Sequence, residues 1–285
     1  MVAPISNFAA MHFKLPSSFH NRASKEVAKV FWSGMTNSSK IHWLSWRKLC
    51  NSKSHGGLGF RYSNLQNRAL LAKAAWRMCM DPDSDWAKFT KALYYLHCDF
   101  LQARIGNSPS WAWRSILEDR EALKLGLLWK IGLGNKVDIW HDNWVSSLPS
   151  FKITDQAPLY PTVQKVEELI DHANQRWKKS LIRSIFSTQV TNAILCNQIL
   201  LLPTEDRLVW GIAKNGIFSI KSTYHLLCNV RDTEDKTSTS LTTPNKWAST
   251  PKDVWNLIWK VGATPKIKAF LWRAGAGLSH RGRSI

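Results

Sequence analysis

Residues 64–80, Asn-Leu-Gln-Asn-Arg-Ala-Leu-Leu-Ala-Lys-Ala-Ala-Trp-Arg-Met-Cys-Met, form the segment that decides the fold class. Its apolar side chains recur at spacings of three and four residues, which places them on one face of a helix. They are Leu65, Ala69, Ala72 and Trp76. Asp81-Pro82 follows and ends the pattern, because proline does not continue a helix. We therefore predict a long amphipathic helix here, within a helical N-terminal half.

Similar patterns on both sides of this segment predict further helices. By their periodicity and end signals, they are expected at residues 24–33, 42–50, 83–95, 109–124, 163–171, 178–186, 190–201, 252–259 and 265–274. Ser108-Pro109 is expected to start the helix at 109–124, because a capping residue followed by proline is a typical first turn. The glycine cluster in residues 55–60 predicts a tight turn.

Two β-hairpins are expected between these helices. Residues 127–131 and 136–140 flank a glycine-containing turn, and residues 207–212 and 217–220 flank Asn215-Gly216. Asn-Gly readily adopts the positive φ angles of a two-residue hairpin turn. The fold class is therefore mainly α with two short β-hairpins, an α+β protein. Residues 231–250, rich in Thr, Ser, Asp and Lys, predict a flexible linker.

The composition points to a nucleic-acid partner. The chain has 285 residues, with 39 Lys plus Arg against 20 Asp plus Glu, a net charge of +19. Twelve of these cations and one acid fall in the segment 1–80, and the segment 251–285 is also basic. Cations neutralise phosphates, and the 16 tryptophans are flat rings that could stack on bases. The alternative is a basic globular protein with tryptophan in its core, and the composition leaves both open.

Basic residues that alternate with tryptophan supply the candidate nucleic-acid-binding residues. They are Arg47, Lys48, Lys53, Arg61, Arg68, Lys73, Arg77, Lys266, Lys268 and Arg273. For the Lys and Arg side chains, contact with phosphate and a solvated helix face are equally good interpretations. For the individual tryptophans the helical spacing favours the core.

No motif for catalysis, metal binding or membrane insertion is found. The five cysteines are odd in number and widely spaced, without the paired spacing of a zinc site. Adjacent aspartates, a phosphate-binding loop and a nucleophile motif are all missing. No apolar stretch is long enough to span a bilayer, and no secretory signal is found. We expect a non-enzyme without cofactor, small-molecule substrate or membrane contact, located inside the cell in the nucleus or cytoplasm.

Eight stretches in order resemble the region that follows the reverse transcriptase domain in plant LINE-type (non-LTR) retroelement proteins. They are FWSG (31–34), KIHWLSWRKLC (40–50), GGLGF (56–60), NRALLAKAAWR (67–77), SWAWRSIL (110–117), VDIWHDNW (137–144), KNGIFSIKSTY (214–224) and PKIKAFLWR (265–273). They are spread between residues 31 and 273, so the resemblance extends over nearly the whole chain.

The resemblance implies a domain plan. Residues 1–125 would be a basic helical connector after the polymerase, and 126–230 a hairpin and helix region. After the linker, 251–285 would be the start of the zinc-binding domain, whose hairpin begins near residue 207. In the family the zinc ligands follow a few dozen residues beyond the segment at 265–273. No zinc ligand and no polymerase, endonuclease or ribonuclease H residue can therefore be carried over to this chain.

The expected function follows from charge and resemblance together. We expect a truncated retroelement-derived product without catalysis that binds RNA or DNA weakly and non-specifically. The alternative is a structural remnant without ligand, whose tryptophans are all buried. An active reverse transcriptase is disfavoured, because no converging carboxylates are found.

Overall fold

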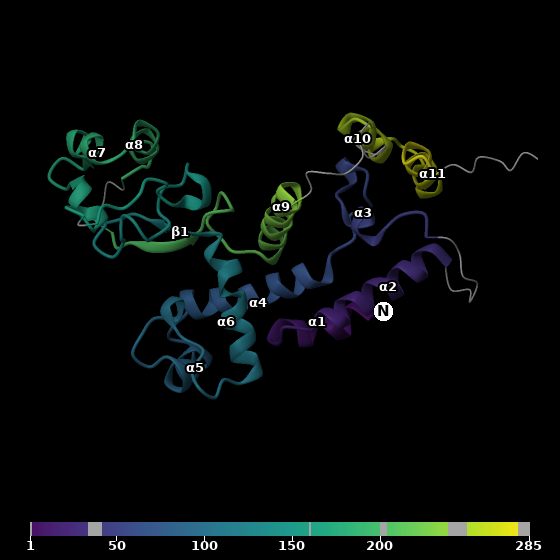
Figure 1. Cartoon of the computed structure of the whole chain (residues 1–285), viewed down its shortest axis with the longest axis horizontal. Helices are drawn as coiled ribbons and strands as arrows, with labels where there is room; N and C mark the ends of the chain where they lie inside the picture. Colours follow the sequence, from purple (N-terminus) through teal and green to yellow (C-terminus); the bar gives the residue numbers. More distant parts are fainter. Residues whose placement is uncertain (1, 34–41, 160, 200–203, 239–249, 279–285) are drawn as a thin grey trace, which may run out of the picture. The chain divides into compact units, whose positions relative to one another are not determined.

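The computed structural model describes residues 2–33, 42–159, 161–199, 204–238 and 250–278. Within them the chain is mainly helical with two small antiparallel sheets, which confirms the predicted fold class (Figure 1). The helices are α1 Val2–His12, α2 Ser17–Ser33, α3 Trp46–Cys50, α4 Ser63–Met80, α5 Asp85–Tyr94, α6 Trp111–Lys124, α7 Lys179–Ile185, α8 Thr188–Leu195, α9 Ile220–Ser238, α10 Lys252–Lys260 and α11 Pro265–Gly275. The strands are β1 Leu127–Lys130, β2 Ile170–Asp171, β3 Arg176–Trp177 and β4 Arg207–Trp210.

The chain forms two compact units, and each combines two separate stretches of sequence. Unit 1 consists of Met1–Lys14 and Arg68–Leu227, and unit 2 of Leu15–Asn67 and Cys228–Ile285. The consecutive regions expected from the sequence do not coincide with these units. Segments that are distant in sequence therefore meet inside each unit.

Most of the predicted helices form where their periodicity placed them. The segment at 64–80 is α4, and its predicted face is largely in the core, with Leu65, Ala69 and Ala72 buried. The helices expected at 178–186, 252–259 and 265–274 are α7, α10 and α11. α1 and α9 were not predicted.

The start of α6 differs by two residues from the prediction. Its cap is Ser110, whose hydroxyl accepts a hydrogen bond from the Trp113 amide at 3.2 Å, and the predicted pair Ser108-Pro109 lies before it.

Replacing Ser110 by alanine should destabilise unit 1 by about 1 kcal/mol, because this cap satisfies an otherwise free helix amide. The Ser108→Ala variant is the matched control. Chemical denaturation followed by circular dichroism should rank the two variants in this order, and equal losses would contradict the assignment.

Neither predicted hairpin pairs as expected. β1 pairs with β4 in antiparallel register, with Leu127 opposite Trp210 and Lys130 opposite Arg207. Residues 136–140 form no strand and contribute only an isolated bridge between Asp138 and Lys165. The first strand of one predicted hairpin therefore pairs with the first strand of the other.

The backbone hydrogen bonds explain this exchange. After β1, the amides of Gly132, Gly134 and Lys136 donate to the Asp206 carboxylate, so this stretch cannot fold back onto β1. After β4, the turn at Asn215-Gly216 forms, with Gly216 at φ 70° and its carbonyl accepting from the Trp210 amide. Residues 217–219, where a second strand was predicted, have no regular structure and lead into α9, which begins at Ile220.

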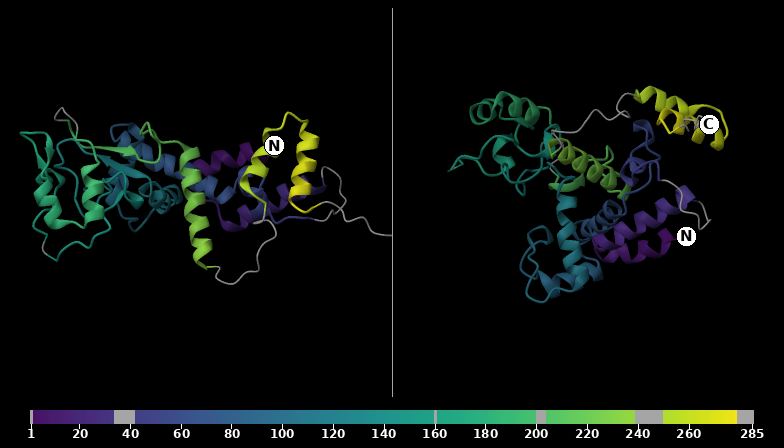
Figure 2. Two further views of the ribbon diagram at one scale, coloured as in Figure 1. Left: turned by 90° about the horizontal axis from the view of Figure 1, so that it is seen from above. Right: turned by 45° about the vertical axis from the view of Figure 1, so that its right-hand side comes forward.

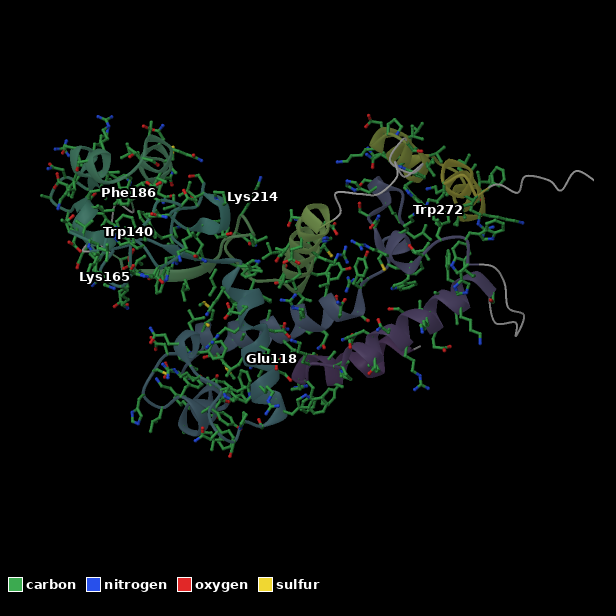
Figure 3. All side chains as sticks on the ribbon, in the orientation of Figure 1. Glu118, Trp140, Lys165, Phe186, Lys214 and Trp272 are labelled. Carbon is green, nitrogen blue, oxygen red and sulfur yellow. The ribbon has the colours of Figure 1, made fainter. Side chains whose placement is uncertain are left out.

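The helix expected at residues 163–171 does not form, and part of a second sheet takes its place. Residues 163–171 form a short 3-10 turn, Val166–Leu169, followed by β2, which pairs with β3. The core of this part of unit 1 is apolar, and it includes the ring pair Trp140 and Phe186 with centroids 5.2 Å apart (Figure 3). The sequence VDIWHDNW therefore serves packing, since Trp140 and Trp144 are both buried.

The predicted linker at 231–250 is partly wrong. Residues 231–238 are the last turns of α9, and residues 239–249 lie outside the described part of the chain. Arg231 on α9 stabilises this part of the helix, since its guanidinium lies 3.7 Å from the centre of the Tyr62 ring. A cation held over an aromatic ring is favourable even where it is partly exposed.

Candidate nucleic-acid interface

Part of the basic N-terminal segment, residues 15–67, and the basic helices α10 and α11 fold around one core in unit 2. The buried residues of this core come from residues 44–49 and from α10 and α11, which are distant in sequence. They are Leu44, Leu49, Trp255, Ile258 and Trp272. The structure thus brings together the basic N-terminal and C-terminal segments that the sequence showed as separate.

The glycine cluster forms a turn that α11 contacts through Trp272. Gly56 has φ 78°, a left-handed conformation that favours glycine. A Cβ atom at Gly57 would collide with the carbonyl of Asn51. The Trp272 indole donates a 2.8 Å hydrogen bond to the Gly56 carbonyl, across 216 residues of sequence. The cluster is therefore a structural turn, as predicted.

α10 and α11 lie side by side in both views of Figure 2 and carry cations close to this turn. The ammonium of Lys53 lies 4.7 Å from the centre of the Trp259 ring. The ammonium of Lys268 donates to the Trp259 carbonyl at 3.0 Å. These contacts hold two of the candidate cations against the same tryptophan.

Most of the net charge belongs to unit 2. This unit contains 18 of the 39 Lys and Arg but five of the 20 Asp and Glu, which gives +13 of the total +19. Because an excess of charge of one sign raises the electrostatic potential, we expect a higher positive potential at unit 2 than at unit 1.

The ten candidate residues divide between the units. Seven lie in unit 2: Arg47, Lys48, Lys53, Arg61, Lys266, Lys268 and Arg273. Three lie on α4 in unit 1: Arg68, Lys73 and Arg77. Lys266 and Arg273 are exposed on α11, and Arg47 is exposed on α3.

Arg68 has a structural role that the sequence did not indicate. Its Nε donates to the Asp119 carboxylate at 2.9 Å, and the Asp119 side chain is only 1% exposed. Burial raises the pKa of Asp119, and the guanidinium opposes this rise. An ion pair to a buried carboxylate is costly to break, so we leave Arg68 out of the interface. Arg77 lies 5.6 Å from the centre of the Trp86 ring.

The tryptophans are mostly structural. Seven are buried: Trp113, Trp140, Trp144, Trp177, Trp210, Trp255 and Trp272. Trp43, Trp86 and Trp111 are exposed, and Trp247 lies outside the described residues. The core interpretation of the individual tryptophans is therefore confirmed for these seven.

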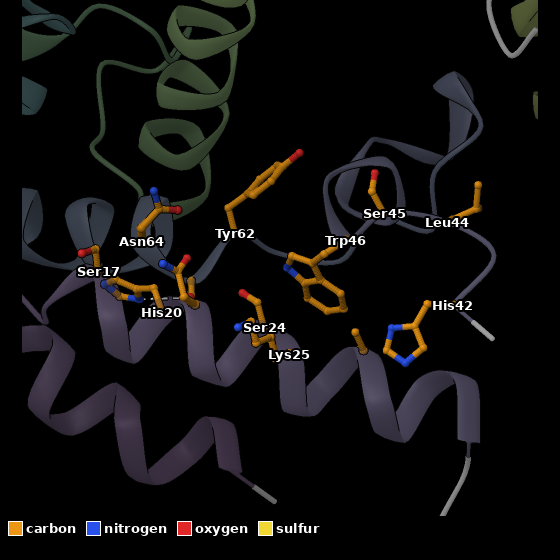
Figure 4. Close-up of a pocket in the computed structure, with 13 residues that line it drawn as sticks. Ser17, His20, Ser24, Lys25, His42, Leu44, Ser45, Trp46, Tyr62 and Asn64 are labelled. Atoms are coloured by element: carbon orange, nitrogen blue, oxygen red, sulfur yellow. Dashed lines mark hydrogen bonds between the residues drawn. The ribbon is translucent and has the colours of Figure 1, made fainter. Parts of the chain in front are cut away.

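Unit 2 also contains a pocket of about 880 Å³ that the sequence analysis missed (Figure 4). One wall is a polar face of α2, and the opposite wall is formed by residues 42–46 and by Tyr62–Asn64. His20 on α2 contacts the Ser63 hydroxyl through Nδ1 at 3.0 Å, and burial lowers the pKa of His20. The only signal in the sequence was the helical spacing of Ser17, His20, Ser24 and Lys25, because the opposite wall comes from two other segments of the chain.

The described residues show no arrangement typical of a metal or catalytic centre. Among them, no three His, Cys, Asp or Glu side chains group together, and all five cysteines are free thiols. Burial raises the pKa of Cys50 and of Cys79 to about 12, so both thiols stay protonated at neutral pH. Asp138 and Asp142 accept hydrogen bonds from nearby backbone amides and stabilise the local turn. None of the described helices combines the length and apolarity that a bilayer crossing requires.

The chain has relatives in Arabidopsis thaliana. The putative ribonuclease H protein At1g65750 is 28% identical over 267 residues, which is 92% of this chain, and the chain spans 40% of that relative. The uncharacterized mitochondrial protein AtMg00310 is 36% identical over 162 residues, which is 56% of this chain and 99% of the relative. No family model matches the chain. No solved structure matches it either. The chain therefore belongs to the same family as the uncharacterized mitochondrial protein AtMg00310 of Arabidopsis thaliana.

Proposed function

We propose that this chain is derived from a plant LINE-type retroelement protein and binds RNA or DNA weakly and non-specifically, without catalysis of its own. The observation that carries the proposal is that residues 15–67 of the basic N-terminal segment fold with the basic helices α10 and α11 in unit 2, around the core of Trp255 and Trp272. Unit 2 carries +13 of the total net charge, and phosphate neutralisation is the main source of non-specific affinity for nucleic acid.

The retroelement origin is supported by the ordered motifs of the sequence. One relative is named after ribonuclease H, an enzyme that acts on nucleic acid, and the chain spans 40% of that relative's length. Because this chain lacks the motifs of polymerase, endonuclease and ribonuclease H sites, we propose a supporting role beside such activities. A nuclear or cytoplasmic location remains part of the proposal.

A structural remnant without ligand is the second candidate. The burial of seven tryptophans favours it, since buried rings cannot stack on bases, whereas the exposure of Trp43, Trp86 and Trp111 does not. This candidate predicts no salt-dependent binding to RNA or DNA, which separates the two by one experiment.

The test is a titration of labelled RNA and duplex DNA with the full chain, followed by fluorescence anisotropy. We expect micromolar affinity at 50 mM salt that falls steeply towards 200 mM, because bound cations release counterions from the phosphates. The double variant Lys266→Glu, Arg273→Glu should weaken binding to all sequences and lower the salt slope by about 2. Both residues are exposed on α11.

The matched control changes the same charge in unit 1. Lys179→Glu, Arg183→Glu alters one lysine and one arginine that are exposed on α7. It should reduce affinity much less if unit 2 is the interface. Equal effects of the two double variants would remove the interface from unit 2, and no binding at 50 mM salt would support the structural remnant.

A further inference from the structure

The pocket in unit 2 has a chemical character different from that of the basic surface. Its lining contains one formally charged side chain, Lys25, and no carboxylate among the described residues. The other polar groups are hydrogen-bond donors and acceptors from serine, asparagine, histidine and tyrosine side chains. Such groups recognise the polar edge of a ligand, whereas lysines and arginines on the surface recognise phosphate charge.

An aromatic ring forms part of the pocket wall. Trp46 points into the pocket from the first residue of α3, opposite α2 (Figure 4). Phe60 stacks on Trp46, with centroids 5.1 Å apart and an interplanar angle of 28°. The Trp46 indole is therefore fixed in orientation, as a stacking platform requires. Its Nε1 donor makes no hydrogen bond to any described residue.

The dimensions of the pocket are compatible with a ligand of nucleotide size. Ligand pockets of small molecules fall in the range of about 300–1,000 Å³, and a volume of about 880 Å³ lies within it. A nucleotide fits such a space, but a base pair inside a duplex has both faces covered by its neighbours and its polar edge engaged. Bases that are unstacked in single strands are typically bound on aromatic rings and read along their edges.

We propose that this pocket takes an unpaired base of single-stranded RNA or DNA, stacked against Trp46 and hydrogen-bonded by the polar face of α2. Lys25 contacts the phosphate of the same nucleotide. This inference rests on the proposed function, because the basic surface of unit 2 supplies the general affinity and the pocket adds a preference for single strands.

The test compares a 12-nucleotide single strand that carries one 2-aminopurine with the same strand in a blunt duplex. The full chain should bind the single strand more tightly at equal salt and should quench 2-aminopurine fluorescence through stacking. Trp46→Ala should lower single-strand affinity by about 10-fold, as expected for the loss of one base stack, and leave duplex affinity nearly unchanged.

A second variant keeps the core intact. Ser24→Phe fills the pocket from α2, and Ser18→Phe places the same side chain at an exposed position of α2 outside the lining. Ser24→Phe should abolish the preference for the single strand, and Ser18→Phe should retain it. This pair decides the question even if Trp46→Ala fails to fold.

The outcomes separate the inference from the proposed function. Salt-dependent binding with equal affinity for single strand and duplex overturns the inference and leaves the proposed function in place. A preference that survives Ser24→Phe also overturns the inference. No binding of either probe at 50 mM salt overturns both.

Discussion

Replacing Trp272 by alanine should destabilise the core of unit 2 by about 3–5 kcal/mol, one of the two largest effects that we expect from a single substitution in this chain. The side chain is 1% exposed and packs in the core with Trp255 and Ile258. Its removal leaves a cavity the size of an indole, and it also leaves the Gly56 carbonyl without its donor. Both losses act on the contact between α11 and the glycine turn.

Hydrogen exchange measured by mass spectrometry is the suitable readout, since it reports on each segment separately. Amides in residues 44–58 and 252–276 should lose protection in Trp272→Ala, whereas amides in β1 and β4 should not. Trp272→Phe retains most of the ring volume and loses the hydrogen bond, so its effect should be smaller. Phe270→Ala is the exposed control, because Phe270 is on the same helix and 66% exposed. A Phe270→Ala effect as large as that of Trp272→Ala would contradict the packing.

Helices were predictable from the sequence because their signals are local. The 64–80 pattern identified α4 within one residue at its start, and α10 and α11 also formed as expected. A helix closes its hydrogen bonds within four residues, so the sequence of the segment is enough to identify it.

Strand pairing was not predictable, because the partner strands are distant in sequence. Leu127 pairs with Trp210, and both lie in segments that had a nearer candidate partner. In place of the local hairpin, the Asp206 carboxylate accepts hydrogen bonds from the amides of Gly132 and Gly134 in the predicted turn and of Lys136 at the start of the predicted second strand. A periodicity of two identifies a strand but does not name its partner.

The candidate interface was predictable only as charge. Counting Lys and Arg identified the two basic segments, but the sequence could not show that they share one core, nor that Arg68 pairs with a buried Asp119 that is 51 residues away. The pocket was not predictable from the sequence either, because it too depends on contacts between distant segments. Its walls come from three segments, and each of them looks like an ordinary solvated surface when taken alone.

Asp206→Ala should destabilise unit 1 by about 3 kcal/mol or more, because one carboxylate fixes a whole turn. The side chain is buried, and its two oxygens accept hydrogen bonds from the amides of Gly132 at 2.7 Å, Gly134 at 2.8 Å and Lys136 at 3.0 Å. Hydrogen bonds to an ionised group are about twice as strong as neutral ones. Alanine would leave the amides of two buried glycines without this acceptor.

The control and the conservative variant test the mechanism. Glu205→Ala removes the neighbouring carboxylate, which is exposed and pairs with Lys136 at the surface, so it should change stability little. Asp206→Asn can still accept from Gly132 and Gly134 but turns an amide N–H₂ group towards the Lys136 amide, and its loss should be intermediate. Urea unfolding of the three variants should follow this order. If Asp206→Ala and Glu205→Ala were equally stable, the carboxylate could not be the group that holds residues 132–136 away from β1 and leaves β1 free to pair with β4.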